Sequence, residues 1–231
     1  KTIEYYAFYA SGIEDITIPA EVESSGGGIF RNSKSLKHVK CESTMMIPYL
    51  GFAGCTALKS FEITGSVTAI DEESFEDTGL EEFVIPSSIK TIGAYAFTGA
   101  KLKQLTIPAS VIGYGVCAFM GCEDLTSVRI ESSANISNDM FSSCLKLSKL
   151  EITGRPTSIG DNAFYRTQLE DAIIPDSVTS IGDGNPFKKE TDKINNEVGF
   201  WYEVVDGKAS IVGYDGDQTD VTIPTTLGGY P

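Results

Sequence analysis

The sequence lacks most of the features that metal, redox and membrane proteins need. It has a single histidine, His38, and its five cysteines include no Cys-x-x-Cys pair, which argues against zinc and thiol redox chemistry. No stretch approaches the roughly 18 continuous apolar residues of a membrane-spanning helix. We therefore expect no metal, no cofactor and no membrane insertion of this segment.

Positive charge is also scarce. The 18 Lys and Arg residues face 32 Asp and Glu residues, which gives a formal net charge of −14. A phosphate backbone would be repelled by such a surface in the absence of a basic patch, and the sequence contains none. Nucleic acid is therefore not an expected partner.

What the sequence has is a repeat. Phenylalanines recur every 22 or 23 residues, and around each one the same short motif returns, as in 89–97 and 158–164. A fixed period of this length is typical of a solenoid, in which each coil buries its apolar side chains against the next. The nine anchors are Phe8, Phe30, Phe52, Phe75, Phe97, Phe119, Phe141, Phe164 and Phe187.

Five or six residues after each anchor comes a short apolar triplet of the form L-x-x-L-x-I. Leu102, Leu105 and Ile107 are one example, and a proline and a turn commonly follow. Proline ends a strand because it removes a donor and fixes φ. The pattern predicts one parallel β-sheet on the concave face of the solenoid. The convex side is expected to consist of turns, short strands or 3-10 segments.

These residues resemble the BspA-like bacterial surface proteins, whose repeats read approximately S-V-x-x-I-G-x-x-A-F-x-x-C-x-x-L-x-x-V-x-I-P. The strongest copies are IGAYAFTGAKLKQLTIPASV and IGDNAFYRTQLEDAIIPDSV, and the match covers roughly residues 2 to 187. The resemblance implies a leucine-rich-repeat solenoid that is displayed on the cell surface and serves adhesion. It implies no catalytic residue.

Some coils depart from this pattern. Tyr114 replaces the isoleucine, Ser137 replaces the glycine, and residues 21–28 have lost the V-x-x-I-G segment, so that local distortion is expected there. Cys55, Cys122 and Cys144 each follow an anchor by three residues. Since that place elsewhere holds Ser33, Thr78, Ala100 and Thr167, these cysteines are predicted to serve packing.

The sequence divides into three segments. The repeat array, about nine repeats, covers 1–187, and a polar linker covers 188–199. Residues 200–231 are expected to form a β-hairpin around Asp206-Gly207 and then to begin a further repeat, because 221–224 matches 105–108. Since Lys1 also lies within a repeat, we expect a fragment of a longer chain, from which a leader could have been removed, with possible end-to-end self-association of its open coils.

Side chains between the apolar residues of each triplet should face the concave surface, where Lys59, Glu81 and Lys103 would be neighbours. Either this face is solvated and its charges pair with one another, or it docks a ligand. The residues singled out as a possible binding face are Lys37, Lys59, Glu81, Lys103, Arg129, Lys149, Glu151 and Glu170.

Three functions remain open. The leading hypothesis is a non-catalytic extracellular module that binds a protein or glycan of a host or neighbouring cell, and the second is a structural spacer that holds another domain away from the cell. A hydrolase is a distant third, because His38 has no recognisable nucleophile motif and Glu81 and Glu82 are adjacent in a strand. The aspartates of 215–220 and the glycines of 26–28 are interpreted as turn and loop residues.

Overall fold

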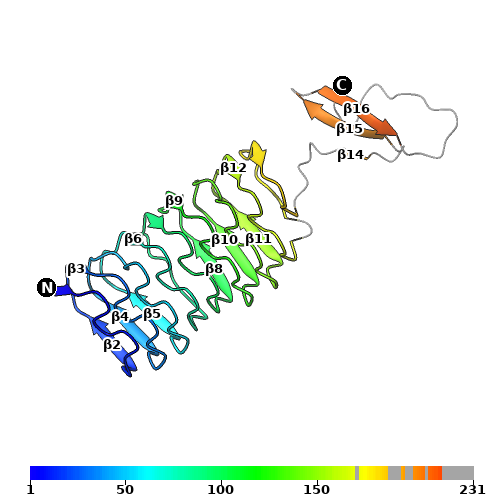
Figure 1. The fold of residues 1–231 in the computed structure, drawn as a ribbon. Helices are drawn as coiled ribbons and strands as arrows, with labels where there is room; N and C mark the ends of the chain where they lie inside the picture. Colours follow the sequence, from blue (N-terminus) through cyan, green and yellow to red (C-terminus); the bar gives the residue numbers. More distant parts are fainter. Residues whose placement is uncertain (170–171, 187–193, 196–199, 206–207, 215–231) are drawn as a thin grey trace. The chain divides into compact units, whose positions relative to one another are not determined.

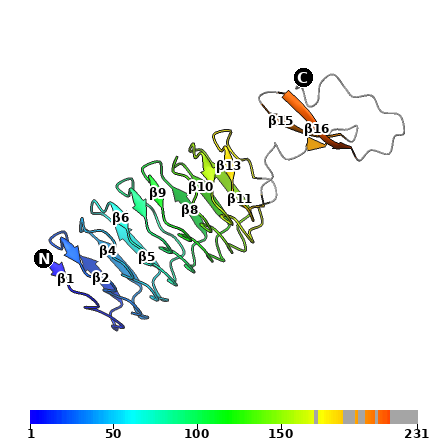
Figure 2. The same cartoon turned by 45° about the horizontal axis from the view of Figure 1, so that its top comes forward.

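The computed structural model describes residues 1–169, 172–186, 194–195, 200–205 and 208–214. The chain forms two compact units, Lys1–Pro186 and Phe187–Pro231. The first unit is a stack of coils, as Figures 1 and 2 show. Strands and turns make up the described residues, among which no helix occurs.

One face of the stack carries the strands of the L-x-x-L-x-I segments, and we call it the long-strand face. The four-residue strands pair in parallel, in the orders β2-β4-β5 and β8-β10-β11. Their bounds are β2 Asp15–Ile18, β4 His38–Cys41, β5 Ser60–Ile63, β8 Gln104–Ile107, β10 Ser127–Ile130 and β11 Lys149–Ile152. Apolar residues alternate with exposed ones along these strands, as expected for strands with one buried face.

The expectation of one continuous sheet on this face is wrong. The coil between β5 and β8 contains no strand at Glu81–Ile85, so the structure has two three-stranded sheets. The coil that follows β11 also contains no strand at 172–174. The long-strand face is therefore interrupted near its middle.

A second side of the stack carries two-residue strands from the V-x-x-I-G segments. They also pair in parallel, and the bridges Ile47↔Ile70 and Ile136↔Ile159 continue them. Their bounds are β1 Thr2–Ile3, β3 Ser24–Ser25, β6 Ala69–Ile70, β7 Thr91–Ile92, β9 Gly113–Tyr114, β12 Ser158–Ile159 and β13 Ser180–Ile181. The predicted turns and short strands are present, and no 3-10 segment occurs in the described residues.

The anchors form the core. The rings of eight phenylalanines, Phe8 to Phe164, stack with centroids 4.8 to 5.6 Å apart, and the seven from Phe30 onward are completely buried. Phe61 and Phe83, from the long-strand face, pack edge-on against this column, with Phe61 4.9 Å from Phe75. Stacking of one coil on the next thus buries aromatic surface that a single coil could not cover.

The turn around each anchor is joined to the next coil by backbone hydrogen bonds. The Phe97 amide donates to the Ala118 carbonyl at 2.8 Å, and the Gly99 amide donates to the Met120 carbonyl at 2.9 Å. Residues two before and two after each anchor have positive φ, as Tyr95 (φ 55) and Gly99 (φ 70) illustrate. This turn ladder keeps the anchor rings aligned from coil to coil.

The coils that depart from the consensus sequence keep the same backbone path and pairing register as the others. Tyr114 pairs in register with Ile92, and the Ser137 hydroxyl donates to the Gly115 carbonyl at 2.8 Å. In the coil where the V-x-x-I-G segment looked lost, Val22 is buried and Ser25 pairs with Ile3. Ser25 therefore occupies the isoleucine position, and the expected distortion of the backbone does not occur at these places.

The last coil ends one residue away from the predicted register. Ile159 pairs with Ile181, which places Pro186, not Phe187, at the position equivalent to Phe164. The side chain of Asn185 accepts the hydrogen bond of the Phe164 amide at 3.0 Å. Phe187 itself lies outside the described residues.

In the second unit, β14 Ile194–Asn195, β15 Phe200–Val205 and β16 Lys208–Tyr214 form an antiparallel sheet in the order β14-β15-β16. The predicted hairpin is therefore present, since β15 pairs antiparallel with β16. The Asp206-Gly207 turn, the proposed start of a further repeat and most of the 188–199 linker lie outside the described residues.

Candidate functional site

The exposed residues of the long-strand face form three columns that run across the strands. The register Asp15↔His38↔Ser60 defines the middle column, which continues through Gln104, Ser127 and Lys149. One outer column contains Glu14, Lys37, Lys59, Glu81 and Lys103, and the other contains Thr17, Lys40, Glu62, Val84, Thr106, Arg129, Glu151 and Ile173. The candidate residues chosen from the sequence are thus distributed over all three columns.

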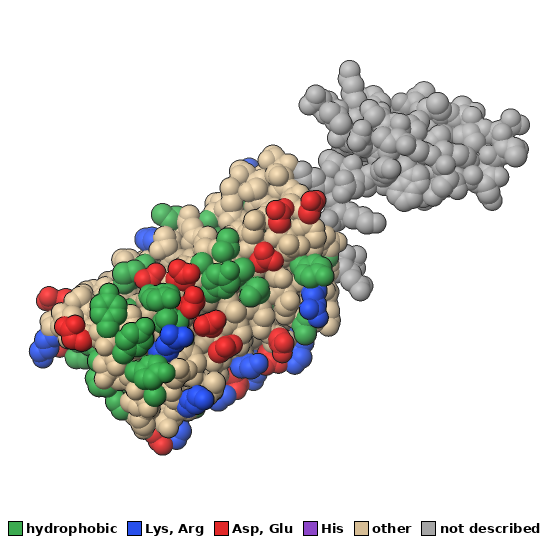
Figure 3. Space-filling model, in the orientation of Figure 1, with side chains coloured by type: hydrophobic (Ala, Val, Ile, Leu, Met, Phe, Trp, Pro, Cys, Tyr) green, Lys and Arg blue, Asp and Glu red, His purple; other side chains and the backbone are tan. Residues whose placement is uncertain are grey.

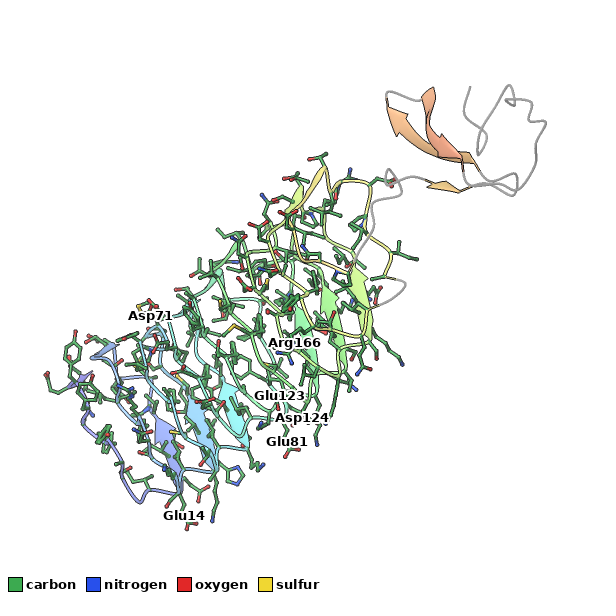
Figure 4. The ribbon with its side chains drawn as sticks, turned by 45° about the vertical axis from the view of Figure 1, so that its right-hand side comes forward. Glu14, Asp71, Glu81, Glu123, Asp124 and Arg166 are labelled. Atoms are coloured by element: carbon green, nitrogen blue, oxygen red, sulfur yellow. The ribbon has the colours of Figure 1, made fainter. Side chains whose placement is uncertain are left out.

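The first outer column is a ladder of ion pairs. Glu81 lies between two lysines, with Oε1 2.9 Å from Lys59 Nζ and Oε2 2.5 Å from Lys103 Nζ. Lys37 Nζ lies 2.7 Å from Glu14 Oε2 in the first coils. Figure 4 shows Glu14 and Glu81 on one side of the stack and Asp71 on the other. The neighbours are those that the repeat register predicts.

These pairs determine the charge state of the face. Hydrogen bonds from Lys103 and Lys59, together with their positive charge, lower the pKa of Glu81 to about 2. The same contacts raise the pKa of Lys103, through the hydrogen bond with Glu81 first. All three side chains are solvent-exposed, so the pairs contribute little to stability. Glu81 offsets one of the two lysine charges, so these three side chains together keep a formal charge of +1.

The third column is paired only in part. Arg129 binds Glu151 at 2.6 Å and Glu131 at 3.0 Å. Lys149, in the middle column, forms no ion pair with any residue that the structure describes. Glu170 lies outside the described residues, so its place on this face remains a prediction.

Two hollows flank the interruption of the sheet at Glu81–Ile85. A hollow of about 510 Å³ lies on the β5 side of the strandless coil, and another of about 580 Å³ lies on the β8 side. Both are bordered by Glu82 and Val84, and Val84 is 82% exposed. We call Glu82, Val84 and the two hollows the central site. Sequence reasoning missed it, because it treated each coil as an equal strand of one sheet.

His38 has a neighbour that the sequence analysis did not identify. Its Nδ1 lies 2.8 Å from the hydroxyl of Ser60, one coil further on. Adding one repeat length to position 38 gives position 60, so the register would have revealed this pair. A serine hydrolase also requires a group that orients the histidine ring. No described residue hydrogen-bonds the other ring nitrogen, so the pair lacks that part of the machinery.

No group of three or more His, Cys, Asp or Glu side chains with metal-binding geometry occurs in the described part of the chain. The five cysteines are buried and unpaired. Burial raises the pKa of the Cys55 thiol to about 12. Reactive thiols need a lowered pKa, so Cys55 fits the predicted packing role.

The three cysteines that follow anchors also have a hydrogen-bonding role that the sequence analysis did not predict. The thiols of Cys55, Cys122 and Cys144 donate to the carbonyls of Phe30, Phe97 and Phe119, at 3.1, 3.2 and 3.3 Å. In the same position, Ser33 donates to Phe8 and Thr78 to Phe75. A small side chain with a donor is therefore what this column uses most often.

Among the residues that the structure describes, none belongs to a helix that could span a membrane. A search of curated proteins found no match to the chain. A leucine-rich repeat protein from T. pallidum is 26% identical, with a TM-score of 0.66, and the match covers 74% of this chain and 83% of that one.

A second solved structure, a leucine-rich repeat protein from Bacteroides ovatus ATCC 8483, is also 26% identical, with a TM-score of 0.57. The match covers 73% of this chain and 53% of that one, so the chain spans about half the length of that relative. The family model described as the BspA type leucine rich repeat region matches residues 1–81 and 68–192, in six copies. The chain therefore belongs to the BspA-type leucine-rich repeat family, whose members include bacterial surface proteins.

Proposed function

We propose that this chain is a non-catalytic binding module on the outside of a bacterial cell, and that its long-strand face docks a protein or glycan of another cell. Family membership supports the surface location. A solenoid presents an extended surface built from successive coils, which suits the docking of a large partner.

The central site carries this proposal. Val84 is 82% exposed and stands between two hollows in the middle of the face, so its position, more than its exposure, distinguishes it from other exposed aliphatic residues. The Glu82 carboxylate borders both hollows and forms no ion pair within the described residues. An apolar contact beside an unpaired hydrogen-bond acceptor is the usual composition of a recognition site.

The surrounding charges limit the kind of partner. Glu81 pairs with both Lys59 and Lys103, and the Glu82 carboxylate also acts on Lys103, so the two carboxylates balance the two lysines and the surface beside Val84 is not basic. Recognition there therefore depends on shape, apolar contact and hydrogen bonds more than on net charge. Sugar rings and exposed protein loops both offer such contacts.

Binding to immobilised matrix glycoproteins and to a glycan array tests the proposal. Val84→Lys should weaken the binding at least tenfold, because a charge replaces the apolar contact. Ile173→Lys is the matched control: Ile173 is 85% exposed in the same column, in the other strandless coil. Unchanged binding by the Val84 variant, or equal losses in both variants, would exclude the central site.

The alternative function is a structural spacer. The continuous phenylalanine column and the turn ladder favour it, because they join each coil to the next along the described stack. A spacer would bind none of these ligands, and replacing Val84 would change nothing. Wild-type binding that resists both lysine substitutions would instead place the ligand on another face.

A further inference from the structure

Four exposed tyrosines gather on the first coils, around the anchor turns and away from the long-strand face. Their exposed fractions are 71% for Tyr5, 48% for Tyr6, 51% for Tyr9 and 43% for Tyr49. The Tyr6 and Tyr9 rings lie 6.0 Å apart and nearly perpendicular. We call these four residues the tyrosine platform.

The tyrosine platform packs against the backbone of the glycines at 26–28. A Cβ on Gly26 would lie 2.6 Å from the Tyr5 ring, and one on Gly28 would overlap the Tyr6 ring. A Cβ on Gly27 would lie 3.3 Å from the Tyr49 ring. The glycine run, which the sequence identified only as a loop, therefore lets three rings rest directly on the backbone.

The backbone of Tyr6 adopts a conformation that is unfavourable for a residue with a side chain. Its φ is 55°, in the left-handed region that bulky residues avoid. The equivalent residue of the next coil is Gly28, so the position accepts glycine, which would remove the cost. The residue two before each anchor shares this φ, Leu50 and Glu73 included, so the turn itself requires it. The exposure of the tyrosine rings, not the backbone, therefore indicates a binding surface.

Carboxylates border the platform. The anchor turn of the coil after Tyr49 reads Asp71-Glu72-Glu73-Ser74-Phe75-Glu76-Asp77, and none of its five carboxylates forms an ion pair with a described residue. Glu73 and Glu72 lie close enough to raise the pKa of Tyr49, an effect that Arg31 opposes. Figure 3 shows hydrophobic side chains gathered over the N-terminal coils, with charged side chains among them.

We propose that the tyrosine platform docks an arginine-rich segment of a partner protein. The face of an aromatic ring attracts a cation, and a guanidinium stacks on it while its edge donates hydrogen bonds to carboxylates. The platform offers rings in the first and third coils, and the 71–77 turn of the fourth coil offers carboxylates beside Tyr49. Charge complementarity thus selects a cationic partner, and the planar stacking surface selects arginine over lysine.

This interaction is independent of the central site. The tyrosines belong to the anchor turns, and Figure 4 shows Asp71 on the opposite side of the stack from Glu81. A partner could therefore occupy the platform while the long-strand face binds another ligand.

A labelled peptide of alternating arginine and glycine tests the proposal by fluorescence anisotropy, with lysine-glycine and glutamine-glycine peptides for comparison. We expect binding of the arginine peptide, weaker binding of the lysine peptide and none of the glutamine peptide. The double variant Tyr5→Ser/Tyr9→Ser should lose about tenfold in affinity, the loss expected for two exposed cation–π contacts.

Two further variants separate the platform from general surface charge. Glu72→Gln/Glu73→Gln, which keeps the tyrosines, should also weaken binding, whereas Glu131→Gln/Glu151→Gln, with the same charge change on the long-strand face, should not. Tyr165→Ser removes a tyrosine that is 49% exposed at the other end of the stack and serves as the aromatic control.

The proposal is overturned by an absence of arginine-peptide binding, by equal effects of the platform and control variants, or by equal binding of the arginine and lysine peptides. Binding of a neutral oligosaccharide that Tyr5→Ser/Tyr9→Ser abolishes would also overturn it, because the platform would then be a sugar site. Circular dichroism of each variant verifies that its fold is intact.

Discussion

The thiol of Cys55 donates a hydrogen bond to the carbonyl oxygen of Phe30, in the preceding coil, over 3.1 Å. The hydroxyl of Ser33 makes the equivalent bond to Phe8 over 2.8 Å. Side chains one repeat apart thus perform the same task with different chemistry. The column requires a small donor and does not require sulfur.

Cys55→Ser should therefore change the free energy of unfolding by less than about 1 kcal/mol, the net contribution of one hydrogen bond. Cys55→Leu keeps the apolar character but overfills a completely buried position, at a cost of roughly 1–3 kcal/mol. Urea denaturation of both variants measures the difference. If serine proved as costly as leucine, the column would depend on sulfur after all.

Stability should fall in alkali. Burial raises the pKa of Cys55 to about 12, whereas a thiol in the unfolded chain ionises near about 8.5. The unfolded state therefore loses its proton first, and the stability from this group is complete below about pH 8.5 and declines as the pH rises toward 12. Urea midpoints measured across this range should decrease, and the decrease should be smaller in Cys55→Ser. Equal decreases in the two proteins would assign the effect to other groups.

The carboxylate of Glu81 should titrate far below its ordinary range. Hydrogen bonds from Lys103 and Lys59 lower its pKa to about 2, and a carbon-detected NMR titration observes this directly. Lys103→Met should move the midpoint upward, toward the ordinary 4.5, because the largest contribution is removed. Lys37→Met, which removes a lysine paired with Glu14, leaves Glu81 unchanged and serves as the control. A midpoint unaffected by Lys103→Met would mean that the ion pair is not formed in solution.

The repeat, its period and the buried residues could be predicted from the sequence because each coil restates them. The anchors from Phe8 to Phe164 stack as expected, and Glu81 lies between Lys59 and Lys103. The register of the repeats alone predicts both the stacking and the ion pairs. A feature that occurs in one coil and not in the others could not be predicted from the repeat. The coil that lacks a strand at Glu81–Ile85 still carries the apolar triplet, as Leu80, Phe83 and Ile85, so the consensus pattern does not distinguish it from its neighbours.

The tyrosine platform illustrates the same limit. The sequence shows a run of glycines and several tyrosines, but each glycine lies 21 or 22 residues from the tyrosine whose ring it contacts. Only the stacking of coils brings the Tyr5 ring onto Gly26 and the Tyr49 ring onto Gly27. Contacts of this kind are specific to individual side chains, so no repeat pattern predicts them.

Two glycines of one segment provide a final test of how tightly the coils are stacked. A Cβ added to Gly113 meets no atom within 4 Å, whereas one added to Gly115 would overlap the backbone nitrogen of Ala94 in the preceding coil. Gly113→Ala should leave the free energy of unfolding within about 0.5 kcal/mol of the wild type. Gly115→Ala should cost roughly 1–3 kcal/mol, because backbone must move to accommodate it.

Urea denaturation of this pair separates close stacking from a general intolerance of alanine, since the two sites lie two residues apart. The equivalent position of the next coil is Ser137, which carries a Cβ and whose hydroxyl donates to the Gly115 carbonyl. If Gly115→Ala were as stable as Gly113→Ala, the spacing between these coils would be able to widen without cost. Close contact between successive coils would then not be what excludes a side chain at position 115.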